Sequence, residues 1–105
     1  MLNVTNLTFF YSFTAPGPIS NLNVETKHNS LTATWNPPTG DNLKYTVELR
    51  LDGKLLDKKN STVTEQKFNA LASGSYYTVV VFAVSGNLKS PEVKTSKYTR
   101  ELLLY

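Results

Sequence analysis

The chain has 105 residues, of which 40% are hydrophobic and 18% charged, and its formal net charge is +3. This length provides one hydrophobic core without room for a second, and the composition excludes an intrinsically disordered chain. The absence of cysteine excludes a thiolate nucleophile, cysteine-ligated zinc and a disulfide framework. Thr, Ser and Asn are abundant and Gly is scarce, which favours short strands joined by polar loops. We therefore expect an all-β domain.

The first fourteen residues precede the predicted strands and are apolar between Leu7 and Phe13. This stretch is too short to span a membrane, and it lacks the basic start of a signal peptide. We treat residues 1–14 as an N-terminal extension, residues 15–99 as the domain and residues 100–105 as an apolar C-terminal tail.

Apolar and polar residues alternate with a period of two through most of the domain. Leu31, Ala33 and Trp35, for example, are separated by threonines, which is typical of a strand with one buried face. The pattern predicts strands at 19–26, 30–36, 43–51, 54–58, 64–70, 76–85 and 91–99. Strands of this length, about ten residues apart, indicate a β-sandwich.

Turn residues lie between the predicted strands, at 36–41, 52–53, 73–74 and 86–87. The Asp52-Gly53 pair is the strongest signal, because both residues tolerate the positive φ that a type I′ hairpin requires. Seven antiparallel strands bring the chain in at one end of the sandwich and take it out at the other.

These residues resemble a known family. The resemblance is carried by Pro16-Gly17-Pro18, Leu22-Asn23-Val24, Ser30-Leu31, Trp35, Pro37-Pro38, Tyr45-Thr46-Val47, Leu71, Gly74 and the run from Tyr77 to Val84. Together they look like a fibronectin type III domain over about residues 15–99. The resemblance implies a seven-stranded immunoglobulin-like β-sandwich, of the kind found in tandem in cell-surface receptors such as receptor-type tyrosine phosphatases.

The core is expected to form from residues on the apolar side of the central strands. These residues are Trp35, Tyr45, Val47, Leu71, Tyr77, Val79 and Val81. Trp35 should fill the centre, where a buried indole needs a partner for its N–H. Tyr77 follows a tight turn, and in immunoglobulin-like sandwiches such a tyrosine bonds its hydroxyl to upstream backbone.

The N-terminal extension has two interpretations. Leu7 to Thr14 resembles the last strand of a preceding type III repeat, and an unstructured or artificial leader is the alternative. An orphan strand with this aromatic content would pair with an exposed sheet edge, so the first interpretation predicts self-association. The apolar tail at 100–105 could extend the last strand.

The sequence offers no catalytic, cofactor-binding or metal-binding site. His28 is the sole histidine and lies in a predicted turn, and the carboxylates are scattered over loops and outward strand positions. We expect no cofactor and no enzymatic activity, although a catalytic domain could lie elsewhere in a parent chain.

Three sequons make Asn60, Asn3 and Asn6 candidates for N-linked glycosylation. Chance alone gives roughly two sequons at this Asn, Ser and Thr content, so the count carries little weight. Asn60 is the best candidate, because it falls in the predicted loop between the strands at 54–58 and 64–70.

Val80, Phe82 and Val84 lie on the outward side of the predicted strand at 76–85, as an apolar stripe. We interpret this stripe as a candidate contact surface for a neighbouring protein, and the alternative is that the stems of Arg50 and Lys94 cover it. The scattered lysines do not favour polyanion binding, because glutamates are interspersed among them. Nucleic acid binding is excluded by the low net charge and the lack of exposed aromatics among the basic residues.

The resemblance and these exclusions together indicate a non-catalytic module that binds other protein domains, including adjacent type III repeats. We expect it outside the cell, in the ectodomain of a cell-surface receptor or adhesion protein. The alternative is a structural spacer in a matrix protein or a secreted multidomain enzyme. Flanking sequence would distinguish the two.

Overall fold

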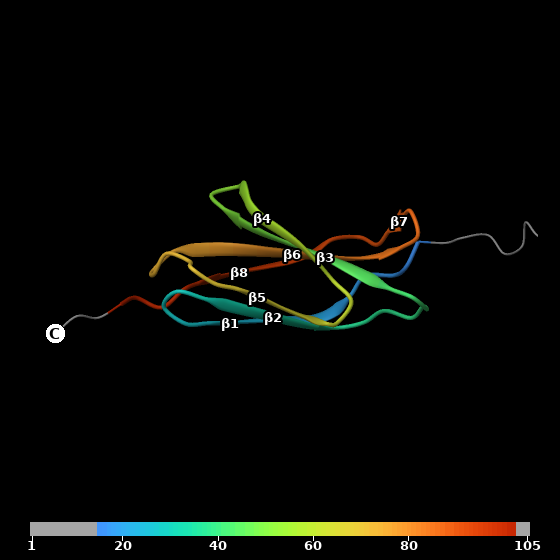
Figure 1. Ribbon diagram of the computed structural model, residues 1–105, viewed down its shortest axis with the longest axis horizontal. Coiled ribbons are helices and arrows are strands. Elements are labelled where there is room, and N and C mark those ends of the chain that lie inside the picture. Colours follow the sequence, from blue (N-terminus) through green and yellow to red (C-terminus); the bar gives the residue numbers. More distant parts are fainter. Residues whose placement is uncertain (1–14, 103–105) are drawn as a thin grey trace, which may run out of the picture.

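The alternating segments form two antiparallel sheets that pack face to face (Figure 1). A computed structural model describes residues 15–102. The strands are β1 (Ser20–Thr26), β2 (Leu31–Asn36), β3 (Lys44–Leu51), β4 (Lys54–Ser61), β5 (Glu65–Phe68), β6 (Tyr76–Ser85), β7 (Leu88–Lys89) and β8 (Val93–Tyr98). One sheet has the order β1-β2-β5, and the other runs β4-β3-β6 with β7 and β8 both paired to β6. The predicted all-β sandwich is confirmed.

The core lies between the sheets and is built from alternate residues of each strand. Its buried members are Ile19, Val24, Leu31, Ala33, Trp35, Tyr45, Val47, Leu49, Phe68, Tyr77, Val79, Val81 and Ala83, with Leu71 half-buried against them. The register of β3 against β6 pairs Val47 with Val81 and Leu49 with Val79. Because side chains alternate across a strand, this register turns both rows toward the opposite sheet.

Residues 15–102 form eight strands, where the sequence predicts seven, because the last strand is divided. β7 and β8 both pair with β6, and Ser90-Pro91-Glu92 separates them. The Ser90 N–H donates to the Ala83 carbonyl at 2.8 Å, and the Ser90 Oγ accepts from the Ala83 N–H, also at 2.8 Å. Pro91 has no N–H to offer the ladder, so regular pairing stops there.

β4 is longer than predicted and β5 is shorter. β4 pairs with β3 from Lys54 to Ser61, so Asn60 lies in a strand and not in the predicted loop. The period-two signal requires one buried face. β4 is a sheet edge, and six of its eight residues are exposed, which explains why its last three residues carried no such signal.

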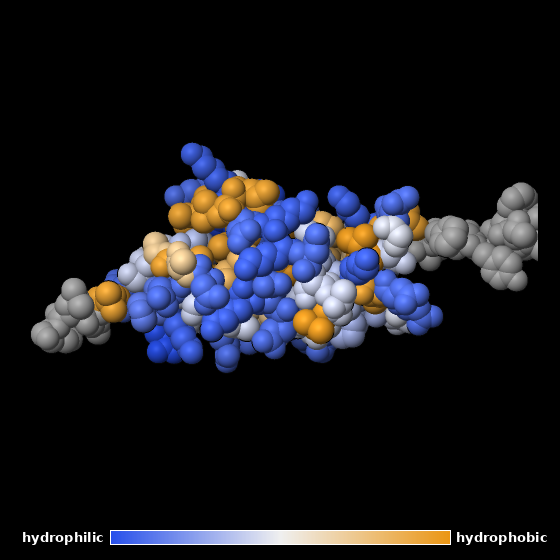
Figure 2. Space-filling view, in the orientation of Figure 1, coloured by the Kyte–Doolittle hydropathy of each residue, from blue (hydrophilic) through white to orange (hydrophobic). Residues whose placement is uncertain are grey.

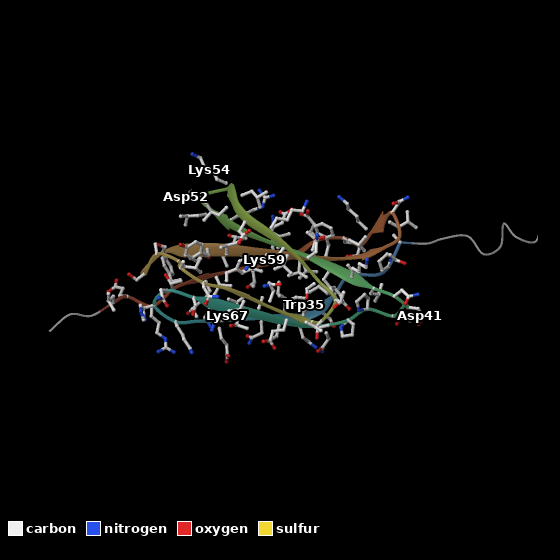
Figure 3. The ribbon with its side chains drawn as sticks, in the orientation of Figure 1. Trp35, Asp41, Asp52, Lys54, Lys59 and Lys67 are labelled. Atoms are coloured by element: carbon white, nitrogen blue, oxygen red, sulfur yellow. The ribbon has the colours of Figure 1, made fainter. Side chains whose placement is uncertain are left out.

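Asp52 and Gly53 join β3 to β4 with φ values of 53° and 79°. Both are in the left-handed region that a type I′ turn needs, as predicted. The sheet arrangement places this hairpin at one end of the sandwich and the loop between β2 and β3 at the other, as the positions of Asp52 and Asp41 show (Figure 3).

The described chain starts and finishes at opposite ends of the sandwich (Figure 1). The N-terminal extension at 1–14, its predicted strand and self-association, and Asn3 and Asn6 lie outside the described residues, as does the tail from 103. β8 ends at Tyr98, so residues 99–102 do not extend it.

No helix in the described part of the chain is long and apolar enough to cross a membrane.

Candidate interaction surfaces

Residues 15–102 contain no group of three or more His, Cys, Asp or Glu side chains placed to hold a metal ion. His28 is exposed in the turn between β1 and β2. The main depressions on residues 15–102 are open to solvent.

Partly buried hydrogen bonds hold the end at which the chain leaves the sandwich. The Tyr77 hydroxyl accepts a hydrogen bond of 2.9 Å from the Ala72 N–H. Thr99 is buried as well, and its Oγ1 donates to the Ala72 carbonyl at 2.7 Å and accepts from the Ser75 N–H at 3.0 Å. The last described residues are therefore tied to the turn before β6.

Trp35 lies between the two sheets (Figure 3) and meets Tyr45 edge-on, with ring centroids 5.4 Å apart. Its Nε1 is buried and makes no hydrogen bond with any residue from 15 to 102, whereas the sequence predicts a hydrogen-bond partner for this N–H. Burial also raises the pKa of Tyr45 above its ordinary value. Both rings belong to the core and are only 4% exposed.

The outward side of β6 is largely covered. Val80 and Phe82 are only 3% and 4% exposed, and Val84 is half-buried. In the sheet register Val80 stands between Glu48 of β3 and Lys94 of β8, and the Lys89 ammonium lies 5.3 Å from the centre of the Phe82 ring.

This burial of Val80 and Phe82 differs from the apolar contact stripe that the sequence predicts. Arg50 itself is held by Glu48, with Nη2 2.7 Å from Oε1. The role of the stripe as a contact surface stays a prediction.

The lysines noted in the sequence lie on different parts of the molecule. Lys59 reaches the Phe68 ring, with its ammonium 5.3 Å from the centroid. Lys97 donates to the Val24 carbonyl at 3.0 Å, on β1 of the opposite sheet. These two ammonium groups are therefore directed at groups of the domain itself.

The structure brings together a surface that sequence reasoning missed, at the end where the described chain starts. Asp41 and Asn42, from the loop after β2, line a depression of about 550 Å³ with Gly86 and Asn87 from the turn after β6 and with Leu88, the first residue of β7. We call these five residues the linker-side surface. Ala15, Pro16 and Gly17 lie close beside it, against the loop at 39–43. Its two loops are more than forty positions apart in sequence, so no local signal could have joined them.

Exposed apolar side chains gather over β4, where Figure 2 shows an orange cluster at the top of the molecule. Leu55 and Leu56 are 48% and 52% exposed. Asn60 is exposed near the far end of the same strand.

The two packed sheets, the Tyr77 corner and the loop-built ends define the class of protein. The chain belongs to the fibronectin type III domain family, whose pattern matches residues 15–97.

Among curated proteins, the chain is similar to receptor-type tyrosine-protein phosphatase eta of Gallus gallus, with 30% identity over 92 residues. It is also similar to receptor-type tyrosine-protein phosphatase H of Homo sapiens, with 34% identity over 80 residues. These matches cover 84% and 72% of this chain but only 6% and 7% of the relatives, so the chain corresponds to a small part of each.

Solved structures share the fold. The extracellular region of rat CD45, domains d3-d4, superposes with a TM-score of 0.78 at 20% identity, covering 82% of this chain and 51% of that one. The FN3tt structure gives 0.75 at 21% identity, covering 84% and 98%.

Proposed function

We propose that this domain is a non-catalytic, extracellular protein-interaction and spacer module in the ectodomain of a cell-surface receptor. The observation that carries the proposal is the similarity to two receptor-type phosphatases over most of this chain and little of theirs. A chain of this size corresponds to one repeat of such a receptor. Any catalytic activity of the parent protein would belong to another domain.

The geometry of the two ends supports the spacer role. The described chain starts at one end and finishes at the other (Figure 1), so domains joined before and after it would stand in line. At the finishing end, Thr99 is anchored to Ala72 and Ser75. At the starting end, Pro16 is buried beside the loop at 39–43. Anchored ends transmit orientation and force between neighbours, whereas a flexible linker would not.

The linker-side surface is the part of the domain we propose to contact a neighbouring domain. It offers Leu88 as an apolar group, with Asp41, Asn42 and Asn87 around it to donate and accept hydrogen bonds. An apolar centre with a polar rim is the usual composition of a contact between protein domains. Its position beside residues 15–17 favours a neighbour on the N-terminal side.

Antibody labelling of intact cells tests the proposal. An antibody raised against the folded domain should stain cells that express the parent protein without permeabilisation. Staining that requires permeabilisation would contradict an extracellular location. Antigen found in the medium or matrix, and absent from the cell surface, would support the alternative of a spacer in a secreted or matrix protein.

A further inference from the structure

β4 is one edge of the five-stranded sheet, and β7 and β8 form the opposite edge. It pairs with β3 on one side, and no strand from residues 15–102 pairs with its other side. An unpaired edge presents backbone donors and acceptors to any extended segment, and proteins protect such edges with charges or cover. Lys54, Lys58 and Lys59 supply charge along β4, while Leu55 and Leu56 leave it apolar near the hairpin.

Asn60 is the last but one residue of this edge strand and begins the sequon Asn60-Ser61-Thr62. It is exposed and stands opposite Thr46 of β3. Directly after it, the Ser61 Oγ accepts from the Val63 N–H at 3.1 Å and donates to the Val63 carbonyl at 2.8 Å, which turns the chain away from the sheet. Asn60 remains exposed to solvent beside this turn.

The hydrogen bond that Asn60 makes leaves its nitrogen available. Thr46 Oγ1 donates to Asn60 Oδ1 at 3.1 Å. An N-linked glycan is attached through the side-chain nitrogen of a sequon asparagine, and the amide oxygen remains a carbonyl. Attachment would preserve the contact with Thr46, and that contact would fix the direction of the first sugar.

We infer that Asn60 carries an N-linked glycan that covers the free edge of β4. The inference rests on the proposed extracellular location, because the modification requires passage through the secretory pathway. The glycan would cover the end of β4 that lies farthest from the Asp52-Gly53 hairpin, next to Lys58 and Lys59.

Expression of the full chain in a secretory host tests the modification. The secreted protein should lose mass on treatment with peptide N-glycosidase, and peptide mapping should place the converted residue at Asn60. T62A breaks the sequon but keeps Asn60 and its contact with Thr46, so it should abolish the loss at this site. T62S keeps a working sequon and should retain it. A folded, secreted protein without sugar at Asn60 would overturn the inference and leave the proposed function standing.

Trypsin tests the covering of the edge. Proteases bind their substrates as extended segments, so an edge strand with Lys58 and Lys59 is an open target in the native domain. Native wild-type protein should be cleaved more slowly after these lysines than native T62A, while T62S should behave as wild type. Circular dichroism checks that all three proteins are folded. Equal cleavage of glycosylated wild type and T62A would overturn the claim that the glycan covers β4.

Discussion

Tyr77 shows how one hydroxyl group can hold a turn. Its ring is buried in the core, and its oxygen accepts the Ala72 N–H at 2.9 Å. Tyr77→Phe keeps the ring and removes this hydrogen bond, so it should lower the free energy of unfolding by about 0.5–1.5 kcal/mol. Urea unfolding measures the change. Tyr76→Phe removes an exposed hydroxyl from the adjacent residue and should have little effect, and equal losses in both variants would contradict the assignment.

Loss of the Tyr45 proton should lower the stability of the domain at alkaline pH. Burial raises its pKa above the ordinary value of 10.0, so the folded state holds this proton to higher pH than the unfolded chain does. The associated stability is present below pH 10 and is lost as the pH rises toward the raised pKa. The decline is at most about 1.4 kcal/mol per pH unit.

Tyr45→Phe should flatten this part of the stability curve, because phenylalanine has no proton to lose. Thermal unfolding between pH 9 and 11 measures it, and the difference between the two proteins removes the shared titration of lysines. A parallel decline in both would show that Tyr45 is not responsible.

At the level of residues, alternation could predict the burial of Trp35, Tyr45 and Tyr77, because a period of two directs a whole row to one face. It could not predict hydrogen-bond partners of the core. The unpaired Nε1 of Trp35 depends on how two sheets pack. The same holds for the burial of Val80 and Phe82, because their neighbours, such as Lys89 beside the Phe82 ring, lie on other strands.

At the level of elements, Ser90 lies where the last strand is divided. Its hydroxyl oxygen accepts the Ala83 N–H in place of a backbone carbonyl. Ser90→Ala removes the Oγ that receives the Ala83 N–H. A buried donor left unpaired costs about 1–3 kcal/mol. The Ala83 amide should exchange its hydrogen faster, as NMR can measure. Ser96→Ala is the control, because its half-buried partner Thr78 keeps access to water. Unchanged exchange at Ala83 would contradict this role.

The bounds of a strand could be predicted from the sequence where one face of the strand is buried, and could not where both faces are exposed. β1, β2, β3 and β6 fall within a residue of the predicted bounds, because each contributes to the core. β4 lies at an edge, and its last residues carry no alternation. Asn60 was therefore expected in a loop, and only the pairing with Thr46 places it in the sheet.

At the scale of the whole molecule, we expect the two ends of the sandwich to differ in solvent exposure within the parent protein. The linker-side surface should be covered by the neighbouring domain, whereas the Asp52-Gly53 hairpin, at the opposite end, stands on the outer sheet edge (Figure 3). Hydrogen exchange should therefore slow at Asn42 and Asn87 in the intact ectodomain, compared with the isolated domain. Exchange at Asp52 and Gly53 should be unchanged, which makes the hairpin an internal control. Equal exchange at Asn87 in both proteins would mean that the repeats are joined without contact at this surface, as beads on a flexible chain.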